Sequence, residues 1–287
     1  MKEYKWATLG CGVIANQLAQ AFAANGRKLY SVANRTHEKA VAFAEKYGID
    51  KVYDLCEKSI TLNAEELEEA VHLAEEHHVV LAEAMTIFHM PIYKELRIRM
   101  DTGEFGELRL LQMNFGSYKE YDMKNRFFNR NLAGGALLDI GVYALSFLRW
   151  FMSSKPDQIL SQVKYAPTGV DEQASILLKN KEEEMATVIL SLHAKQPKRG
   201  TISFDKAYIE LFEYPRGEEA IITYTEDGHK EVVSIGSTDR ALEYEVADME
   251  VAVAGEKNRM HLDYTIDVMD MMTSIRKDWG MRYPEEE

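Results

Sequence analysis

The chain has 287 residues and a mass of 32.9 kDa, enough for two ordinary domains, and its 46% apolar and 28% charged residues are typical of a folded, water-soluble protein. The net charge of −13 argues against nucleic acid as a partner, because phosphate binding needs a dense basic surface. No apolar run indicates a signal peptide or a membrane span, and the two cysteines, Cys11 and Cys56, lack zinc-ligand spacing, so we expect a cytoplasmic protein without a metal site.

The first part of the chain alternates between strand and helix patterns. Strands are predicted over residues 4–9 and 29–34, and each is followed by a helix, the second over 36–47. A strand, a glycine turn, a helix and a second strand are typical of the start of a doubly wound parallel sheet. The sequence therefore predicts an N-terminal Rossmann domain.

The pattern then departs from that fold. Residues 51–54 continue it, but a long amphipathic helix over 63–77 follows almost at once, and then a short strand over 79–83. A connection between parallel strands needs a dozen or more residues. We therefore predict that a strand and its crossover are missing at the junction between Asp54 and Leu55.

From residue 108 onward the pattern is that of a largely antiparallel sheet. A helix is predicted over 136–152, two final helices over 240–254 and 262–277, and strands over 108–115, 158–166, 174–179, 186–192, 200–212, 220–225 and 230–235. The expected fold is α/β, with a Rossmann domain over 1–84 and an α+β domain over 85–287. The second domain is expected to carry a large, mostly antiparallel, open-faced sheet.

The first strand leads into a glycine turn, Gly10-x-Gly12-x-x-Ala15. Gly10 permits the tight turn, Gly12 lets a pyrophosphate approach the backbone, and Ala15 lets the helix pack closely on the strand. The start of the helix, with Val13 and Ile14, would face the phosphates. Glycine pairs also occur in ordinary turns, but the position between the first strand and the first helix favours dinucleotide binding.

The end of the second strand bears on the choice of coenzyme. An acidic residue there would bind the ribose 2′-hydroxyl of NAD, but this sequence has Asn34-Arg35-Thr36. The Arg35 guanidinium and the Thr36 hydroxyl suit a 2′-phosphate, which favours NADP over NAD. The alternative is that Arg35 is an ordinary solvated surface residue.

Asp139 and Tyr143 are four residues apart in the predicted mid-chain helix and so share one face. A tyrosine beside a carboxylate is a candidate for proton transfer, although such pairs also serve as structural hydrogen bonds. Phe147 stands where a Tyr-x-x-x-Lys pair would have its lysine. An activating cation must therefore come from elsewhere, and Lys58 is the candidate.

Taken together, these motifs resemble the glucose–fructose oxidoreductase / inositol dehydrogenase family (Gfo/Idh/MocA), and the tyrosine is similar to that of its dimeric dihydrodiol and D-xylose dehydrogenase branch. Four segments carry the resemblance in one order along the chain: Gly10-x-Gly12-x-x-Ala15, Cys56-Glu57-Lys58-Ser59, Glu83-Ala84 and Gly134-Gly-Ala-Leu-Leu-Asp-Ile-Gly-Val-Tyr143. The resemblance implies that Glu57 and Lys58 lie at the coenzyme, with Lys58 beside the nicotinamide and substrate. It also implies that Tyr143 transfers the proton, that Asp139 is its neighbour, and that two subunits pair through the open sheet.

This sequence also departs from the family. Ser59 replaces the family's proline, and members carry roughly forty more residues at the position of the 54/55 junction, part of them at the nicotinamide site. Arg126 and His193 are candidate substrate-binding residues. A surface role for Arg126 is equally compatible with the sequence, and for His193 the sequence favours a structural role over substrate binding. The expected function is an NADP-dependent dehydrogenase acting on a small diol, polyol or sugar. The alternatives are a coenzyme-binding protein without catalysis and a same-fold enzyme of different chemistry.

Overall fold

The computed structural model spans residues 1–287 and describes all of them except 1–3, 35–36, 55–59, 124 and 256–258. The chain divides into two compact units. The first comprises Met1–Thr61 and Asp239–Arg259, and the second comprises Leu62–Thr238 and Met260–Glu287. The boundary expected at 84/85 therefore differs from the division seen here, because the helix that follows residue 61 packs on the last long helix of the chain.

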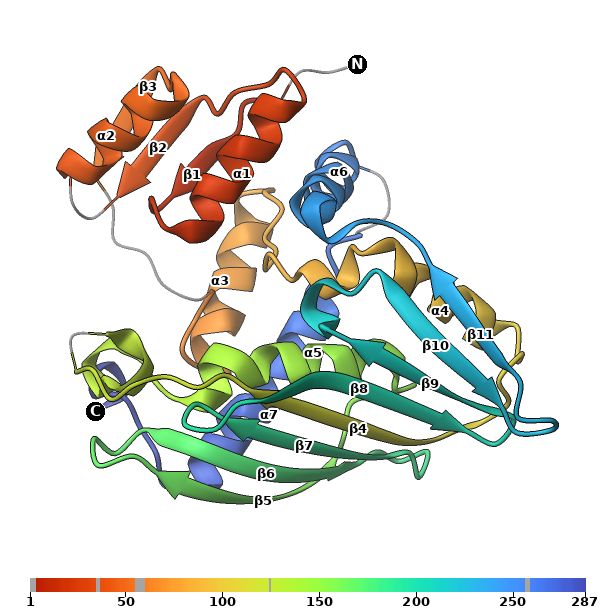
Figure 1. Cartoon of the computed structure of the whole chain (residues 1–287). Coiled ribbons are helices and arrows are strands. Elements are labelled where there is room, and N and C mark those ends of the chain that lie inside the picture. The colour runs from red at the N-terminus through yellow and green to blue at the C-terminus, as the bar shows by residue number, and fades with distance from the viewer. Residues whose placement is uncertain (1–3, 35–36, 55–59, 124, 256–258) are drawn as a thin grey trace. The chain divides into compact units, whose positions relative to one another are not determined.

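The first unit is built on a small parallel sheet (Figure 1). Its strands are β1 (Ala7–Leu9), β2 (Ser31–Asn34) and β3 (Lys51–Asp54), in the order β1-β2-β3. The register pairs Thr8 with Val32 and Val32 with Val52. The described part of this unit has three α-helices, which are α1 (Val13–Ala24), α2 (His37–Tyr47) and α6 (Ala241–Val253).

One apolar core holds these elements together. Phe22 of α1, Val32 of β2 and Phe43 of α2 are buried in it, and Val246 brings α6 into the same cluster. The Trp6 indole N–H also donates to a Glu250 carboxylate oxygen at 3.1 Å. The C-terminal segment that carries α6 thus completes a domain begun by the N-terminus, which the sequence analysis did not foresee.

The chain has little room between β3 and the next helix. Only nine residues, 55–63, separate Asp54 from the start of α3 (Ala64–Glu76). The strand expected over 79–83 is wrong: these residues form no regular element, and none of the described strands pairs with them. Residue 55 lies outside the described residues, so the 54/55 junction is not described.

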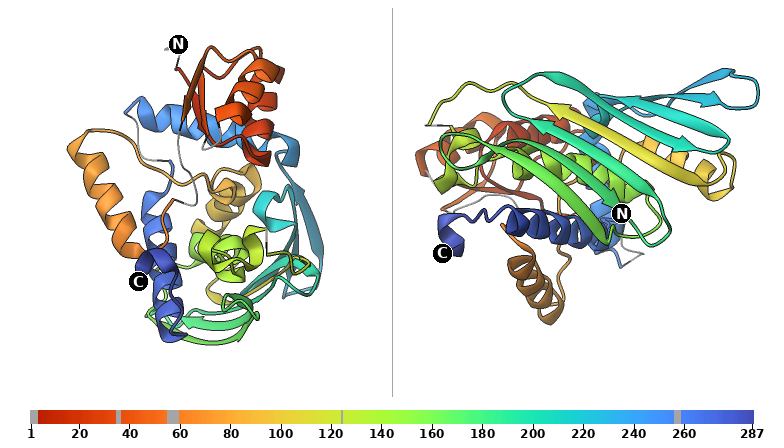
Figure 2. Two further views of the ribbon diagram at one scale, coloured as in Figure 1. Left: turned by 90° about the vertical axis from the view of Figure 1, so that its left-hand side faces the viewer. Right: turned by 90° about the horizontal axis from the view of Figure 1, so that it is seen from below.

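The second unit carries an eight-stranded sheet, in the order β11-β10-β9-β8-β4-β7-β6-β5 (Figures 1 and 2). Only the β4–β7 pair is parallel, and the other neighbours are antiparallel. The expected fold, a parallel N-terminal sheet followed by a mostly antiparallel one, is confirmed. The strands are β4 (Leu108–Gly116), β5 (Gln158–Tyr165), β6 (Asp171–Lys179), β7 (Met185–Ser191), β8 (Gln196–Phe204), β9 (Ala207–Phe212), β10 (Glu219–Tyr224) and β11 (Lys230–Ser234).

One predicted strand is two strands in the structure. The run over 200–212 was expected to be a single strand, but it forms the antiparallel pair β8 and β9. The chain reverses at Asp205-Lys206, where Asp205 is of a type common in tight turns but no glycine, proline or asparagine accompanies it. The expected strand was too long because the signal of this one aspartate was missed.

Helices cover one face of the large sheet, as Figure 2 shows for α5. The covering is close, because a Cβ added at Gly200 of β8 would lie 2.5 Å from the ring of Phe147 on α5. The long helices of this unit are α3, α4 (Pro91–Asp101), α5 (Val142–Phe151) and α7 (Leu262–Asp278). Short 3₁₀ turns lie at Thr86–Phe88, Arg126–Phe128, Arg130–Leu132, Tyr214–Arg216, Thr238–Arg240 and Pro284–Glu286.

One run differs from the expectation that no segment could span a membrane. Arg130–Phe151 is long and apolar enough to do so by length and composition, and 61% of its most apolar 18-residue stretch is buried inside the protein. The run includes α5, whose buried side chains, among them Phe147 and Trp150, lie in the core of the second unit. Its apolar character is accounted for by that core.

The opposite face of the sheet carries exposed apolar side chains. Alternation along each strand places one set of residues on this face, with the buried set on the other. The exposed set includes Leu160, Leu177, Met185, Phe212 and Val232, whose exposed fractions run from 47% to 72%. We call these residues the open face of the sheet.

Candidate active site

Asp139 and Tyr143 lie at the start of the helix that was predicted over 136–152. The structure resolves that helix into a π turn, Leu137–Gly141, followed by α5. Asp139 lies within the π turn and Tyr143 within the first turn of α5. Single π turns inside helices are frequently found at functional sites, because the wider turn changes the direction of the side chains that it carries.

Asp139 is held by a basic neighbour. Arg126, in the 3₁₀ turn that precedes the glycines, forms an ion pair with the Asp139 carboxylate. The Asp139 side chain is 12% exposed, whereas that of Arg126 is 66% exposed. Burial raises the pKa of Asp139, and the positive charges of Arg126 and Lys119 oppose that shift. The structure thus places Arg126, a predicted substrate-binding residue, in contact with a predicted catalytic residue.

Tyr143 lies among charges of both signs. Burial raises the pKa of its phenol, and the carboxylates of Asp139 and Glu83 raise it further. Arg216 and Arg126 act in the opposite direction. A phenol in this setting holds its proton at neutral pH, so it suits proton donation as it stands and needs an additional cation to act as a base.

Glu83 is a titratable neighbour that sequence reasoning gave no role. Burial raises the pKa of its carboxyl to about 7, and the neighbouring Thr265 hydroxyl partly offsets that effect. The residue lies directly before Ala84 in the Glu-Ala motif, which was the one available signal. Arg216 and Lys119 had no sequence signal at all, because they come from distant parts of the chain.

A buried carboxylate supports the glycine turn that leads into the π turn. The Leu137 backbone N–H donates to Asp171 Oδ2 at 2.6 Å, and Asp171 is completely buried. Gly135 has a φ of +126°, and a Cβ there would lie 2.0 Å from Asp171 Oδ1. Glycine is therefore required at this position both for its backbone conformation and for the approach of the carboxylate.

The C-terminal segment holds the same turn from another side. The Tyr283 hydroxyl donates to the carbonyl oxygen of Gly134 at 2.7 Å, and Tyr283 is completely buried. Arg276 forms two hydrogen bonds to Glu286 at 2.7 Å, and the Tyr283 N–H donates to the same carboxylate at 2.8 Å. These contacts fix the backbone that positions Asp139 and Tyr143.

His193 lies in a cluster of aromatic rings. Its Nδ1 is 3.0 Å from the carbonyl oxygen of Lys119, and its ring stacks on Tyr118 at 5.2 Å between centroids. The Tyr121 ring is 4.5 Å from those of both His193 and Phe128. Tyr118 and Tyr121 are 55% and 44% exposed, so they present ring faces to solvent. Both rings lie in the segment that also carries Lys119, a neighbour of Asp139.

The predicted coenzyme turn lies in the first unit. Gly10 adopts a φ of +95°, and a Cβ added at Gly12 would meet no atom within 4 Å. No described side chain caps the start of α1, and Val13 and Ile14 are 73% and 53% exposed there. The backbone of this turn is thus open to a phosphate group, and the residues present fit the pyrophosphate of a dinucleotide.

Other predicted coenzyme residues are only partly described. Ala15 packs against the core of the first unit, and Asn34 ends β2 opposite Asp54 of β3. Four predicted residues lie outside the described part of the chain, namely Arg35, Thr36, Glu57 and Lys58. Their roles remain predictions.

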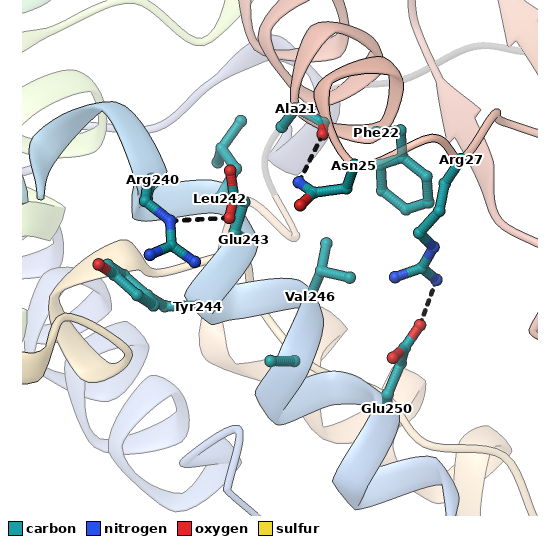
Figure 3. A pocket seen from close by; sticks show the side chains of 11 residues that line it. Ala21, Phe22, Asn25, Arg27, Arg240, Leu242, Glu243, Tyr244, Val246 and Glu250 are labelled. Atoms are coloured by element: carbon teal, nitrogen blue, oxygen red, sulfur yellow. Dashed lines mark hydrogen bonds and ion pairs between the residues drawn. The ribbon is translucent and has the colours of Figure 1, made fainter. Parts of the chain in front are cut away.

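The first unit also contains a cavity of about 370 Å³ (Figure 3). It lies between the end of α1 and α6, so none of the predicted site residues lines it. Its two arginines are paired, Arg27 with Glu250 and Arg240 with Glu243. Its lining on α1 begins at Ala21, nine residues after Gly12, which is about 14 Å along the helix.

Two family models match the chain. The model described as GFO/IDH/MocA C-terminal domain matches residues 93–210, and the one described as NADP oxidoreductase coenzyme F420-dependent matches residues 5–89. The matched regions meet between residues 89 and 93. Together they cover both the glycine turn and the segment with Asp139 and Tyr143.

Among curated proteins the chain is similar to trans-1,2-dihydrobenzene-1,2-diol dehydrogenases. It is 26% identical to the Xenopus tropicalis enzyme over 248 residues, covering 72% of this chain and 74% of that protein. It is 28% identical to the Danio rerio enzyme over 244 residues, covering 81% of this chain and 72% of that protein.

The Xenopus tropicalis alignment also bears on the missing segment. It is 248 residues long, yet 72% of 287 residues is about 207. The relative therefore has about forty residues within the matched region for which this chain has no counterpart. That difference is of the size expected for the segment predicted at the 54/55 junction.

Solved structures share the fold. The aldose-aldose oxidoreductase from Caulobacter crescentus superposes with a TM-score of 0.83 at 17% identity, over 98% of this chain and 99% of that chain. The 3-ketoreductase KijD10 from Actinomadura kijaniata, solved with NADP and TDP-benzene, superposes with a TM-score of 0.82 at 17% identity, over 96% and 98%.

Proposed function

Because the chain belongs to the Gfo/Idh/MocA family of oxidoreductases, we propose that it is an NADP-dependent dehydrogenase acting on a hydroxyl-bearing carbon of a small diol, polyol or sugar. The observation that carries the proposal is the Asp139–Tyr143 pair, which stands on the family's glycine-led helix within a cluster of charges. The diol and sugar substrates of the relatives agree with that assignment.

The proposed chemistry divides between coenzyme and protein. NADP, when bound, supplies the hydride acceptor for oxidation of the alcohol. Tyr143 removes the hydroxyl proton, and Asp139 and Arg126 orient the substrate hydroxyls beside it. Since the described carboxylates raise the pKa of Tyr143, the base form requires a cation, and the family resemblance assigns that task to Lys58.

The proposed preference for NADP rests on the end of β2. The chain has Asn34-Arg35-Thr36 where an NAD enzyme would carry an acidic residue. Replacing Arg35 by Ala should weaken NADP binding and leave NAD binding nearly unchanged. Titration of both coenzymes against the two proteins tests this. An equal loss for both coenzymes, or a preference of the natural chain for NAD, would contradict the assignment.

The function is tested by a substrate screen. Purified protein is incubated with NADP and each of a set of diols, pentoses, hexoses and inositols, and NADPH formation is followed by absorbance. We expect turnover with at least one cyclic diol or sugar, and its loss in Tyr143→Phe. Turnover that is unaffected by Tyr143→Phe would exclude the proposed role of this residue.

A second candidate is a coenzyme-binding protein without catalysis. It is favoured by the forty or so residues that the Xenopus tropicalis relative has within the matched region and this chain lacks. The family resemblance implies that a segment missing at the 54/55 junction would include part of the nicotinamide site. The dehydrogenase and the non-catalytic protein differ in whether any substrate of the screen is turned over. NADP binding without turnover of any substrate in the screen would support the non-catalytic protein.

We also propose that the protein forms a homodimer through the open face. The support is the row of exposed apolar side chains on strands from β5 to β11, which a single copy leaves in water. Leu177→Glu should give a monomer by light scattering, whereas Leu73→Glu, at an exposed leucine of α3, should not. A monomeric natural chain at micromolar concentration would contradict the proposal.

A further inference from the structure

The first unit contains one half of a dinucleotide-binding fold. Its elements run β1-α1-β2-α2-β3, and the strands lie in the order β1-β2-β3. A complete fold has two such halves, each suited to one mononucleotide, and the dinucleotide lies across the point where the strand order reverses. In this chain the elements of the first half are present in full.

The second half has no room between β3 and α3. After β3 only nine residues precede α3, and α3 belongs to the second unit. A further parallel strand alone would need a crossover of a dozen or more residues. The alignment with the Xenopus tropicalis relative points the same way, because about forty of that protein's residues lack a counterpart here.

The position of β1 shows how the missing second half changes the coenzyme site. In the three-stranded sheet β1 is an edge strand, paired with β2 alone among the described strands. In a complete fold the next strand would lie beside β1, and together they would form the crevice that receives the nicotinamide nucleotide. Here the sheet supplies one wall of that crevice.

The described part of the adenosine side, by contrast, has the features of a complete site. The Gly10 turn has its positive φ, Gly12 leaves open space in front of the backbone, and the start of α1 is exposed. Asn34 ends β2, where the adenosine ribose lies in folds of this kind. These are the elements that hold the adenine mononucleotide and the pyrophosphate.

We propose that this chain holds NADP by its adenosine diphosphate end alone, so that the nicotinamide adds nothing measurable to the affinity. The inference rests on the proposed coenzyme, and it sets this chain apart from relatives that have both halves. It follows that the oxidation state of the nicotinamide does not change the affinity, and that any molecule with the adenosine end competes fully with NADP.

Equilibrium titration of the purified full chain tests the proposal. The probes are NADP, NADPH, 2′-phospho-ADP-ribose, which lacks only the nicotinamide ring, and nicotinamide mononucleotide. We expect the first three to have Kd values within about threefold of one another, a difference below about 0.7 kcal/mol. Nicotinamide mononucleotide should neither bind nor compete at concentrations that saturate with the others.

The titration distinguishes failure of this inference from failure of the proposed coenzyme. If NADP binds at least about tenfold more tightly than 2′-phospho-ADP-ribose, the nicotinamide has a site of its own and this inference is wrong, while the proposed coenzyme stands. If none of the four probes binds, the proposed coenzyme is wrong and the inference falls with it.

A pair of variants shows that the binding measured is at the glycine turn. Gly12→Val places a side chain in the open space where the phosphates would lie, without meeting another atom of the protein within 4 Å of its Cβ. It should abolish binding of NADP and of 2′-phospho-ADP-ribose alike. Ala24→Val, at the exposed far end of α1, is the matched control and should leave both affinities unchanged.

Discussion

The buried carboxylate of Asp171 accepts a hydrogen bond from the backbone N–H of Leu137 at 2.6 Å, where the π turn that carries Asp139 begins. Asp171 starts β6, so one strand of the large sheet supports the turn from beneath. The proposed site therefore depends on a contact between segments 34 residues apart in the sequence. Five consequences can be measured.

Removing the Asp171 carboxylate should destabilise the protein and disturb the site. Asp171→Ala leaves the buried Leu137 N–H without an acceptor, which should lower the free energy of unfolding by about 1–3 kcal/mol. Asp171→Asn keeps an acceptor oxygen and should cost less. Urea unfolding of the three proteins measures both effects. Equal losses in the two variants would mean that the charge matters and the hydrogen bond does not.

The stability of the protein should fall as the pH rises toward neutrality. Burial raises the pKa of Asp171 from 3.8 to about 7 in the folded state, so the folded protein holds a proton there that the unfolded chain releases. This contribution is complete below about pH 4 and is lost as the pH rises through about 7. It amounts to at most about 4 kcal/mol.

Asp171→Asn is the control for that pH dependence. It removes the titrating group, so its free energy of unfolding should change less between pH 4 and pH 7 than that of the natural chain. Glu83, whose pKa is also raised to about 7, leaves a residual slope of the same sign. A natural chain whose stability rises over this range would show that other groups dominate.

Asp139 and Arg126 should shift the pKa of Tyr143 in opposite directions. The Asp139 carboxylate raises that pKa and the Arg126 guanidinium lowers it, although the two groups form one ion pair. Asp139→Asn should therefore lower the pKa of Tyr143, and Arg126→Ala should raise it. Ultraviolet difference titration against Tyr143→Phe measures both. Shifts of the same sign would mean that the two variants act by disturbing the fold.

Tyr143→Phe should remove activity and leave coenzyme binding nearly unchanged. Loss of an acid–base group costs about 10²–10⁴-fold in turnover. The matched control is Tyr208→Phe, which removes a hydroxyl from an exposed tyrosine of β9. The turnover and the NADP affinity of both variants are measured. A comparable loss of turnover in the control would contradict a specific role for Tyr143.

Gly135 and Gly12 should respond differently to the same substitution. Gly135→Ala forces a Cβ to within 2.0 Å of Asp171 Oδ1 at a φ of +126°, and should cost about 2–4 kcal/mol of stability. Gly12→Ala meets no atom within 4 Å and should leave stability within about 0.5 kcal/mol. Thermal unfolding compares them. Equal destabilisation would mean that the Gly12 turn is tighter than the structure indicates.

Much of the fold and part of the candidate site could be predicted from the sequence. Gly10, Gly12 and Ala15 identified the turn between β1 and α1, because a tight turn and a close helix limit the residues that fit there. The spacing of Asp139 and Tyr143 placed them in one helical segment. The alternation of apolar residues indicated most strands of the large sheet. Each of these signals lies within a few residues of chain, where neighbouring side chains and backbone conformation decide the outcome.

The remaining features were decided by tertiary structure. Asp171 supports the glycine turn, and Tyr283 holds it from the other side, through contacts between segments distant in sequence. The reversal between β8 and β9 is seen only in the antiparallel pairing of these two strands. The sequence by itself determined which side chains carry the proposed chemistry, because their types and spacing are local. Packing alone decided their neighbours and hence their pKa values, because burial and charge are set by segments that meet only in the folded chain.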